Sequence, residues 1–236
     1  MVVFIKEEEW ERSENEDNEL SVVVVKDKPR RPPHNYMGIV RDAFRPFDTS
    51  SLEKICEQLY SGVLLREKKQ ERDKYWVDQE SNKNCFMVLA RDLAITWGGD
   101  PERWRWIDYI ESDDEEEIQV AVLLSVCWLE IKGKFPTIGL APGTVYEVAF
   151  KVMMLDSSFG WSFPVKISAT LPNGKKEEHE EFIGRYRKNE WVDIPICEFT
   201  MSQENVGEVA FSMDEHDGGK WKHGMAVMGV SFCPKK

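Results

Sequence analysis

Tryptophans crowd one stretch of the chain, residues 84–106, which reads NCFMVLARDLAITWGGDPERWRW. Trp97 precedes the turn-forming residues 98–101, and Trp104 and Trp106 follow them at a spacing of two, which places both side chains on one face of an extended strand. An indole offers a flat apolar surface, and a sugar ring has apolar C–H faces with hydroxyl edges, so the stretch could bind a saccharide by stacking. The alternative is that the indoles fill a protein core, and Trp106 fits that alternative best.

Short segments in a fixed order carry a family resemblance. They are Asn84-Cys85-Phe86-Met87, Ala90-Arg91-Asp92-Leu93, Ile95-Thr96-Trp97, Trp104 with Trp106, Val126-Cys127-Trp128-Leu129-Glu130-Ile131 with Gly133-Lys134, Leu140-Ala141-Pro142-Gly143-Thr144, Gly160-Trp161, Trp191-Val192-Asp193 with Glu198-Phe199, Gly207-Glu208-Val209, Trp221-Lys222-His223-Gly224 and Gly229-Val230. Together they resemble the phloem protein 2 family of plant lectins, which includes the Nictaba-like agglutinins. The likeness covers about residues 75–235 and extends more weakly back to about residue 35. It implies a non-catalytic lectin of jelly-roll topology that binds N-acetylglucosamine oligomers (chitin oligomers) or N-glycan cores.

The resemblance also points to two acids near the C-terminal strands, and Glu208 and Glu215 stand at the matching positions. Ionised carboxylates accept strong hydrogen bonds from sugar hydroxyls. Because the two positions differ by an odd number, a regular strand would place their side chains on opposite faces. For both to reach one site, at least one should lie in a turn or beyond a bulge. Glu215 is the more loop-like of the two. The expected ligand contacts are, in order, Trp97, Trp104, Glu215 and Glu208. Trp221 could border the site, although a core position is the expectation.

Catalysis and metal binding are not predicted. Glu208 and Glu215 would be the minimum pair for glycoside hydrolysis, but no second acidic motif, nucleophile elbow or phosphate-binding glycine loop accompanies them. The histidines are not spaced as a metal triad. The acidic run at 111–117 lacks the spaced oxygen donors and glycine of a calcium loop. We therefore expect no enzyme activity, no cofactor and no metal.

The chain is acidic, with 31 Lys+Arg against 43 Asp+Glu and a net charge of −12. This charge disfavours nucleic-acid binding through long-range attraction. Small basic clusters at residues 68–69 and 220–223 leave contact with RNA open, and solvated surface also explains them. The alternative to a lectin is a module that binds phloem proteins or RNA and uses the sandwich as a scaffold. A homodimer formed through a sheet edge is also compatible with the sequence.

The N-terminal residues lack the basic and long apolar regions of a secretory signal, and no run approaches the roughly 18 apolar residues of a membrane helix. The expectation is a cytoplasmic or nucleocytoplasmic protein without membrane insertion, and the resemblance implies phloem sieve elements or companion cells. The cysteines lack any C-x-x-C pairing, which argues against a zinc site. Cys85, Cys127 and Cys197 are predicted to be buried thiols. For Cys233, near the end of the chain, the resemblance implies possible intermolecular disulfides.

Three regions are predicted to position these side chains. Residues 1–34 are acidic and proline-rich and are expected to be disordered. Residues 35–74 form a helical segment, in which an apolar stripe predicts a helix at 48–60 that Gly62 ends. Residues 75–236 are expected to form the β-sandwich domain that the resemblance to phloem lectins implies.

Alternating apolar residues predict most of the strands. From Tyr146 to Met154 every even position is apolar, as one buried sheet face requires, and the Pro-Asn-Gly at 172–174 predicts a hairpin turn. The expected fold class is all-β, an antiparallel jelly-roll-like β-sandwich with a short N-terminal helical extension and a disordered acidic N-terminus. Strands are expected at 118–124, 126–135, 145–155, 165–171, 191–199, 208–213 and 225–232.

Overall fold

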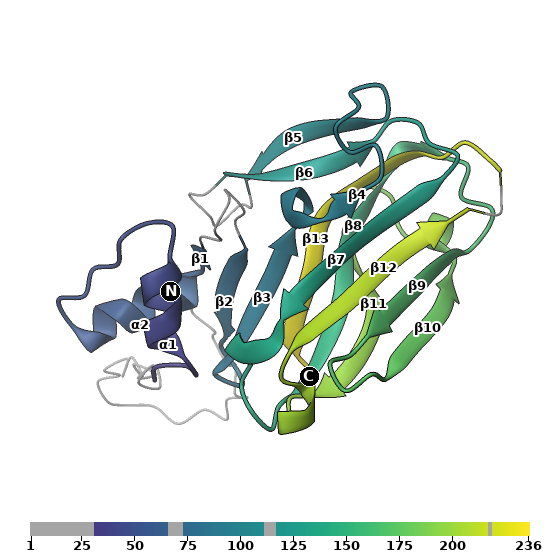
Figure 1. The fold of residues 1–236 in the computed structure, drawn as a ribbon. Helices are drawn as coiled ribbons and strands as arrows, with labels where there is room; N and C mark the ends of the chain where they lie inside the picture. The colour runs from purple at the N-terminus through teal and green to yellow at the C-terminus, as the bar shows by residue number, and fades with distance from the viewer. Residues whose placement is uncertain (1–30, 66–72, 111–116, 217–218) are drawn as a thin grey trace, which may run out of the picture.

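The computed structural model describes residues 31–65, 73–110, 117–216 and 219–236. Its strands form two antiparallel sheets that pack face to face, with two short helices to one side (Figure 1). The predicted all-β antiparallel sandwich is confirmed. Most of the predicted disordered extension, and most of the acidic run at 111–117, fall outside the described residues.

The larger sheet has eight strands. Its main order is β1–β2–β3–β13–β6–β5, and β13 also pairs with β8, which pairs with β11. The strands are β1 (Val63–Leu64), β2 (Lys74–Asp78), β3 (Lys83–Leu89), β5 (Trp104–Ile110), β6 (Glu117–Leu123), β8 (Val145–Phe159), β11 (Trp191–Thr200) and β13 (His223–Pro234).

The smaller sheet has five strands in the order β10–β9–β12–β7–β4. They are β4 (Ala94–Ile95), β7 (Leu129–Pro136), β9 (Val165–Thr170), β10 (Lys176–Glu181) and β12 (Glu208–Glu215). Single turns of 3-10 helix occur at η1 (Ala90–Asp92), η2 (Thr137–Gly139), η3 (Ile183–Arg185) and η4 (Gln203–Asn205).

The main core fills the space between the sheets. The predicted apolar face of β8 is fully buried, at Tyr146, Val148, Phe150, Val152 and Met154. Aromatic rings join the two sheets across the core. The rings of Phe135 and Phe232 stack at 4.2 Å, and those of Phe150 and Phe211 meet edge to face at 6.0 Å. The sandwich is therefore closed by inward-facing side chains of both sheets.

The predicted strands correspond to β6, β7, β8, β9, β11, β12 and β13, with shifted ends. The hairpin turn is also present, because β9 pairs with β10 and Gly174 has a φ of 87°. Strand β10 was not predicted, because its sequence, KEEHEE, contains no apolar residue. Charged side chains suit its position at the edge of the sheet, where they oppose pairing with another chain.

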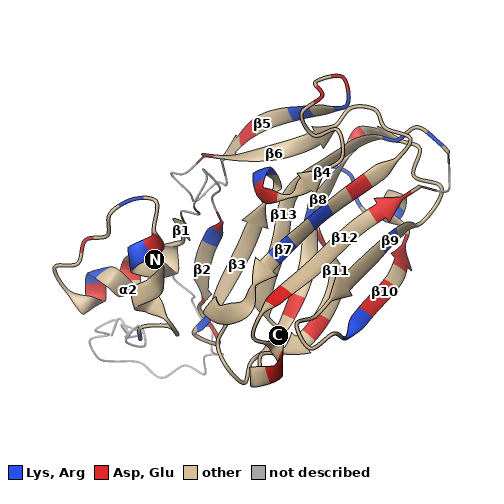
Figure 2. Ribbon diagram, viewed as in Figure 1, with Lys and Arg blue, Asp and Glu red and all other residues tan. Residues whose placement is uncertain are grey.

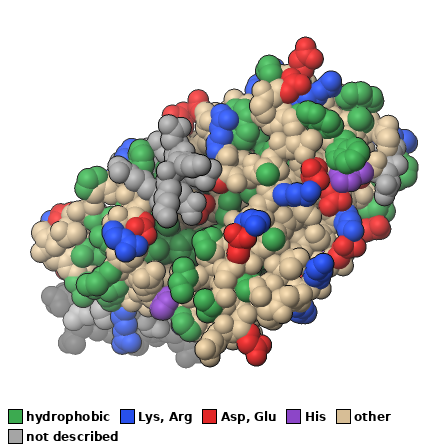
Figure 3. All heavy atoms as spheres, in the orientation of Figure 1, with side chains coloured by type: hydrophobic (Ala, Val, Ile, Leu, Met, Phe, Trp, Pro, Cys, Tyr) green, Lys and Arg blue, Asp and Glu red, His purple; other side chains and the backbone are tan. Residues whose placement is uncertain are grey.

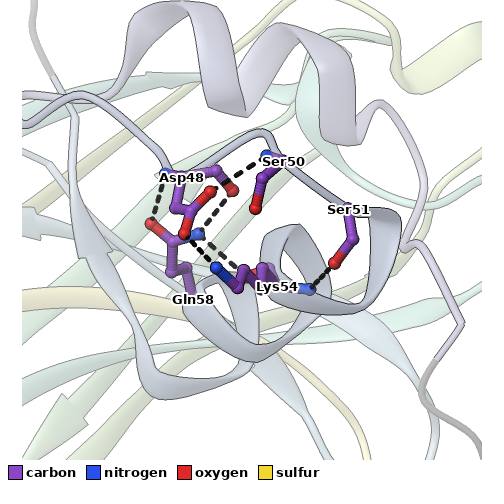
Figure 4. A network of polar contacts seen from close by, with 5 residues as sticks. All are labelled: Asp48, Ser50, Ser51, Lys54 and Gln58. Carbon is purple, nitrogen blue, oxygen red and sulfur yellow. Dashed lines mark hydrogen bonds and ion pairs between the residues drawn. The ribbon is translucent and has the colours of Figure 1, made fainter.

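Two helices precede the sandwich, α1 (Tyr36–Asp42) and α2 (Leu52–Ser61). The predicted helix corresponds to α2, whose N-cap Ser51 accepts a hydrogen bond from the Lys54 backbone N–H at 3.2 Å. Figure 4 shows that Asp48 binds the Lys54 ammonium at 2.7 Å and exchanges hydrogen bonds with Gln58. The segment predicted as helical also contains β1, which pairs with β2. Within the described ranges no helix is long and apolar enough to cross a membrane.

The cysteines differ in burial. Cys85 and Cys197 are buried, as predicted, whereas Cys127 is only partly buried. Cys233 is not an isolated end thiol. Its neighbour Phe232 pairs with Phe86 of β3, and a hydrogen bond between the Cys85 and Cys233 thiols, followed by burial, raises the pKa of Cys85.

Candidate functional site

Four connections between the two sheets meet at one end of the sandwich, at the upper right of Figure 1. Hydrogen bonds join them. The backbone of Val126 exchanges two with that of Lys222, and the Leu124 N–H donates to the Arg103 carbonyl at 2.8 Å. We call this surface the loop end. It comprises residues 96–103 (β4 to β5), 124–128 (β6 to β7), 160–164 (β8 to β9), and 216 with 219–222 (β12 to β13).

Exposed tryptophans gather at the loop end. Among the described residues, the exposed ones are Trp97 (47%), Trp128 (48%) and Trp221 (50%), and each comes from a different connection. Phe163, from a fourth connection, is also exposed. Large apolar side chains scattered singly need no explanation, but a group at one end of a sandwich is a candidate binding surface.

Trp97 has an unusual backbone for a bulky residue, with a φ of 58° in the left-handed region. The indole N–H groups of Trp104 and Trp106 donate to the carbonyls on either side of it, those of Thr96 (3.2 Å) and Gly98 (2.8 Å). These two hydrogen bonds hold the loop from the side of the sandwich, while the Trp97 indole faces solvent. Strained backbone of this kind, worth about 1–3 kcal/mol, clusters at functional sites.

Trp104 was predicted as a ligand contact, but the structure places it in the core with 2% exposure. Its ring has no open face for a ligand, and its role is to support the Trp97 loop. Trp106, expected in the core, is only partly buried, and the Arg91 guanidinium lies 3.7 Å from the centre of its ring.

Trp128 was not singled out in the sequence analysis. Its ring packs on that of His216, with 4.1 Å between centroids. Its exposure could have been predicted from the sequence. Trp128 is separated by even numbers of residues from Glu130 and Lys132, which form the polar face of β7. That spacing predicts an outward-facing indole.

Trp221 was expected in the core, and that expectation is wrong. Half of the residue is exposed, and the Arg103 guanidinium lies 5.3 Å from the ring centroid. Arg103 comes from the same connection as Trp97, so this contact brings the first and last connections of the loop end together.

Glu215 lies at the loop end but does not face solvent. Its carboxylate forms a buried ion pair with the Lys222 ammonium, and the two side chains are 5% and 2% exposed. The ammonium also donates to the carbonyls of Cys127 (3.0 Å) and Lys220 (3.1 Å). The pair therefore holds the β12–β13 connection against the β6–β7 connection and offers little to a ligand.

Glu208 lies at the opposite end of β12. The strand pairs with β7 without a break from Glu208 opposite Pro136 to Glu215 opposite Leu129. Neither acid lies in a turn or beyond a bulge, contrary to the expectation, and the seven intervening steps separate them by about 23 Å. Glu208 instead pairs with Lys134 at 2.7 Å. The structure does not bring Glu208 together with the other three predicted residues.

Glu130, in β7 next to the loop end, was not predicted as a site residue from the sequence. It accepts from the Thr96 hydroxyl at 2.8 Å and pairs with the Lys132 ammonium at 2.5 Å. The bond from Lys132, followed by that from Thr96, lowers the pKa of Glu130. An ionised carboxylate therefore lies beside the residue that precedes Trp97.

Residues 83–234 match the sequence profile of a family described as Phloem protein 2. The chain belongs to the phloem protein 2 family. The match begins in β3 and ends with β13, so it takes in all four connections of the loop end.

Phloem protein 2 relatives match most of the chain. It is 42% identical over 238 residues to Protein PHLOEM PROTEIN 2-LIKE A1 of Arabidopsis thaliana, covering 94% of each. It is 35% identical over 191 residues to a protein of Luffa acutangula named Lectin, covering 80% of this chain and 88% of that one.

Solved structures similar to this phloem protein 2 chain include the CBM22-1 xylan-binding domain of Paenibacillus barcinonensis Xyn10C. That similarity has a TM-score of 0.33 and 10% identity, and it covers 63% of this chain and 88% of the domain. A likeness at this level says nothing about the ligand. Within the described parts of the chain, no three His, Cys, Asp or Glu residues gather as a possible metal site.

Proposed function

We propose that the chain is a lectin that binds glycans at the loop end through Trp97, Trp128 and Trp221. The observation that carries the proposal is the arrangement of Trp97, an exposed indole on a left-handed backbone that two inner indoles hold in place. The Luffa acutangula relative named Lectin supports the same class of function.

The proposed mechanism combines stacking with charge-assisted hydrogen bonds. The exposed indoles provide flat faces for the C–H faces of pyranose rings. Glu130 provides an ionised acceptor for hydroxyl or acetamide N–H groups, and a bond to an ionised group is about twice as strong as a neutral one. Because Thr96 and Lys132 already hold this carboxylate, little side-chain entropy is lost on binding.

The proposed ligands are N-acetylglucosamine oligomers or the N-glycan core, a class that rests on the family. Of the residues predicted from the sequence, Trp97 is the proposed direct contact. Trp104 and Glu215 are proposed to act through the loops that they hold, and Glu208 lies outside the loop end.

The test is a fluorescence titration of the purified chain with chitotriose, in parallel with Trp97→Ala. We expect a saturable change in the wild type and at least a tenfold loss of affinity in the variant. The matched control is Ile138→Ala, because Ile138 is an exposed apolar residue of η2, beyond the far end of β7. A response to neither chitotriose nor an N-glycan would contradict the proposal and favour the protein- or RNA-binding alternative.

A further inference from the structure

The outward face of the smaller sheet contains a furrow that no proposed contact uses. It has a volume of about 440 Å³, within the range of roughly 300–1,000 Å³ that is typical of ligand sites. Figure 3 views the molecule onto this sheet, and Figure 2 shows that the sheet carries both acidic and basic residues. The lining residues are Asp92, Ala94, Lys132, Gly133, Lys134, Ser168, Thr170, Ala210, Phe211 and Ser212.

Strand register makes the floor of the furrow. One row across the sheet joins Ala94, Lys132, Ser212 and Ser168, and the adjacent row joins Lys134, Ala210 and Thr170. Apart from the two lysines, these side chains are short, so the floor is low. The furrow crosses β4, β7, β12 and β9, which at about 4.8 Å per strand spacing gives a length of about 14 Å. It is therefore longer than a single sugar ring needs.

Polar groups that could contact a ligand lie along both rows. The Ser168 and Ser212 hydroxyls are 2.8 Å apart, and the Ser212 hydroxyl also donates to the Asp214 carboxylate at 3.3 Å, so both oxygens keep acceptor capacity for a ligand. The side chains of Lys132 and Lys134 are exposed, and they form ion pairs with Glu130 (2.5 Å) and Glu208 (2.7 Å) respectively. The two ion pairs cancel in charge, and Asp92 adds one further carboxylate to the lining.

We propose that this furrow is a second glycan-binding site, which takes a neutral oligosaccharide of several sugar units lying across the strands. The proposal rests on the lectin function proposed above. Glu208 is remote from the loop end, but its ion pair with Lys134 places it at the edge of this second site.

The chemistry of the furrow favours a saccharide over other ligands. Strand β12 is paired on both sides, so a peptide could not add to it as a further strand. Both lysines are neutralised by acids, and the chain carries a net charge of −12, which disfavours a polyanion. The floor mixes the Ser168 and Ser212 hydroxyls with short apolar side chains, which suits the hydroxyl edges and C–H faces of a saccharide. Phe211 is 3% exposed, with its ring in the core, so it offers no stacking surface.

The test is calorimetric titration of the full chain with chitotetraose. Ser212→Arg fills the floor from an outward-facing position, and Thr200→Arg, at an exposed end of β11, is the matched control. We expect the wild type and Thr200→Arg to bind a second equivalent of ligand that Ser212→Arg lacks. Trp97→Ala should lose the other equivalent and keep this one.

The outcomes separate the two proposals. A single equivalent that Ser212→Arg leaves unchanged, or loss of all binding in Trp97→Ala, would overturn the furrow while the lectin proposal stands. Binding that Ser212→Arg removes and Trp97→Ala leaves intact would support the furrow and overturn the loop-end assignment. No binding by any form would overturn both.

Lysine acetylation of the wild type gives a readout that does not depend on a variant folding. Chitotetraose should slow acetylation of Lys134 several-fold; Lys132 is not diagnostic, because it also holds the Glu130 carboxylate proposed for the loop-end site. Chitotetraose should not affect Lys235, which also forms an exposed ion pair, with Glu198 at 2.6 Å. An acetylation rate of Lys134 that chitotetraose leaves unchanged would overturn the proposal.

Discussion

The indole N–H of Trp106 donates to the carbonyl of Gly98 at 2.8 Å, directly beyond the exposed Trp97. With the matching bond from Trp104 to Thr96, it fixes the backbone on both sides of one residue. The tryptophans of this stretch therefore have two different roles. Two indoles hold the loop, and the third faces solvent.

Replacing Trp106 by Phe tests whether its indole N–H holds the Trp97 loop, because the substitution keeps an aromatic ring but removes the N–H. The free Gly98 carbonyl should loosen the loop, lowering stability by about 1 kcal/mol. We expect chitotriose affinity to fall several-fold. The matched control is Trp191→Phe, which removes an indole N–H that donates to the Tyr109 hydroxyl at 3.1 Å, away from the loop end. Equal affinities of the two variants would show that the Trp106 bond does not position Trp97.

The buried pair of Glu215 and Lys222 gives a stability prediction. Lys222→Met removes the ammonium that pairs with a buried carboxylate, and breaking a buried pair costs about 3–5 kcal/mol. Adding Glu215→Leu should recover much of the loss, because the buried carboxylate that Lys222 compensated is then removed as well. Urea unfolding of the single and double variants measures the coupling. Destabilisations that simply add would contradict a paired role.

Cys233 should react with Cys85 rather than with another chain. Phe232 and Phe86 are paired, so the next residues along face each other, and opposed residues of antiparallel strands lie about 4.5–5.5 Å apart, within disulfide range. Oxidised glutathione should therefore form an internal disulfide, with release of two reduced glutathiones. Peptide mapping would identify the bond, and Cys233→Ser should prevent it. A covalent dimer on a non-reducing gel, lost in Cys233→Ser, would contradict this prediction.

The lowered pKa of Glu130 predicts a dependence of stability on pH. A carboxyl whose folded pKa is depressed stabilises the fold above its unfolded value, about 4.3, and that contribution is lost as the pH falls through the folded pKa. Glu130→Gln should therefore show a flatter fall in thermal midpoint between about pH 5 and pH 3. Glu190→Gln, at an exposed acid 3.7 Å from Arg187, is the control. Parallel curves for wild type and Glu130→Gln would count against the ion pair.

Periodicity predicted most of the strands, because the buried positions of β8, β9 and β12 alternate and are occupied by apolar residues. It missed β10, where a charged edge strand buries no apolar face. Parity correctly placed Glu208 and Glu215 on opposite faces, and the error was to assume that both reach one site.

The burial of each tryptophan could not be predicted in the same way. Trp97 and Trp104 lie in one stretch, but burial depends on how the loop crosses from one sheet to the other. That crossing is set by tertiary contacts among distant segments, such as the backbone pairing of Val126 with Lys222. Outward-facing Trp128, by contrast, could have been identified from its parity with Glu130.

The central claim is that glycans bind at the exposed indoles of the loop end. The most direct measurement is the shift of each indole N–H resonance during a nuclear magnetic resonance titration of the labelled chain with chitotriose. Saturable shifts at Trp97, Trp128 and Trp221, with one shared affinity and smaller changes at Trp191, which lies away from the loop end, are the predicted result. Shifts confined to other tryptophans, or none at saturating sugar, would contradict it.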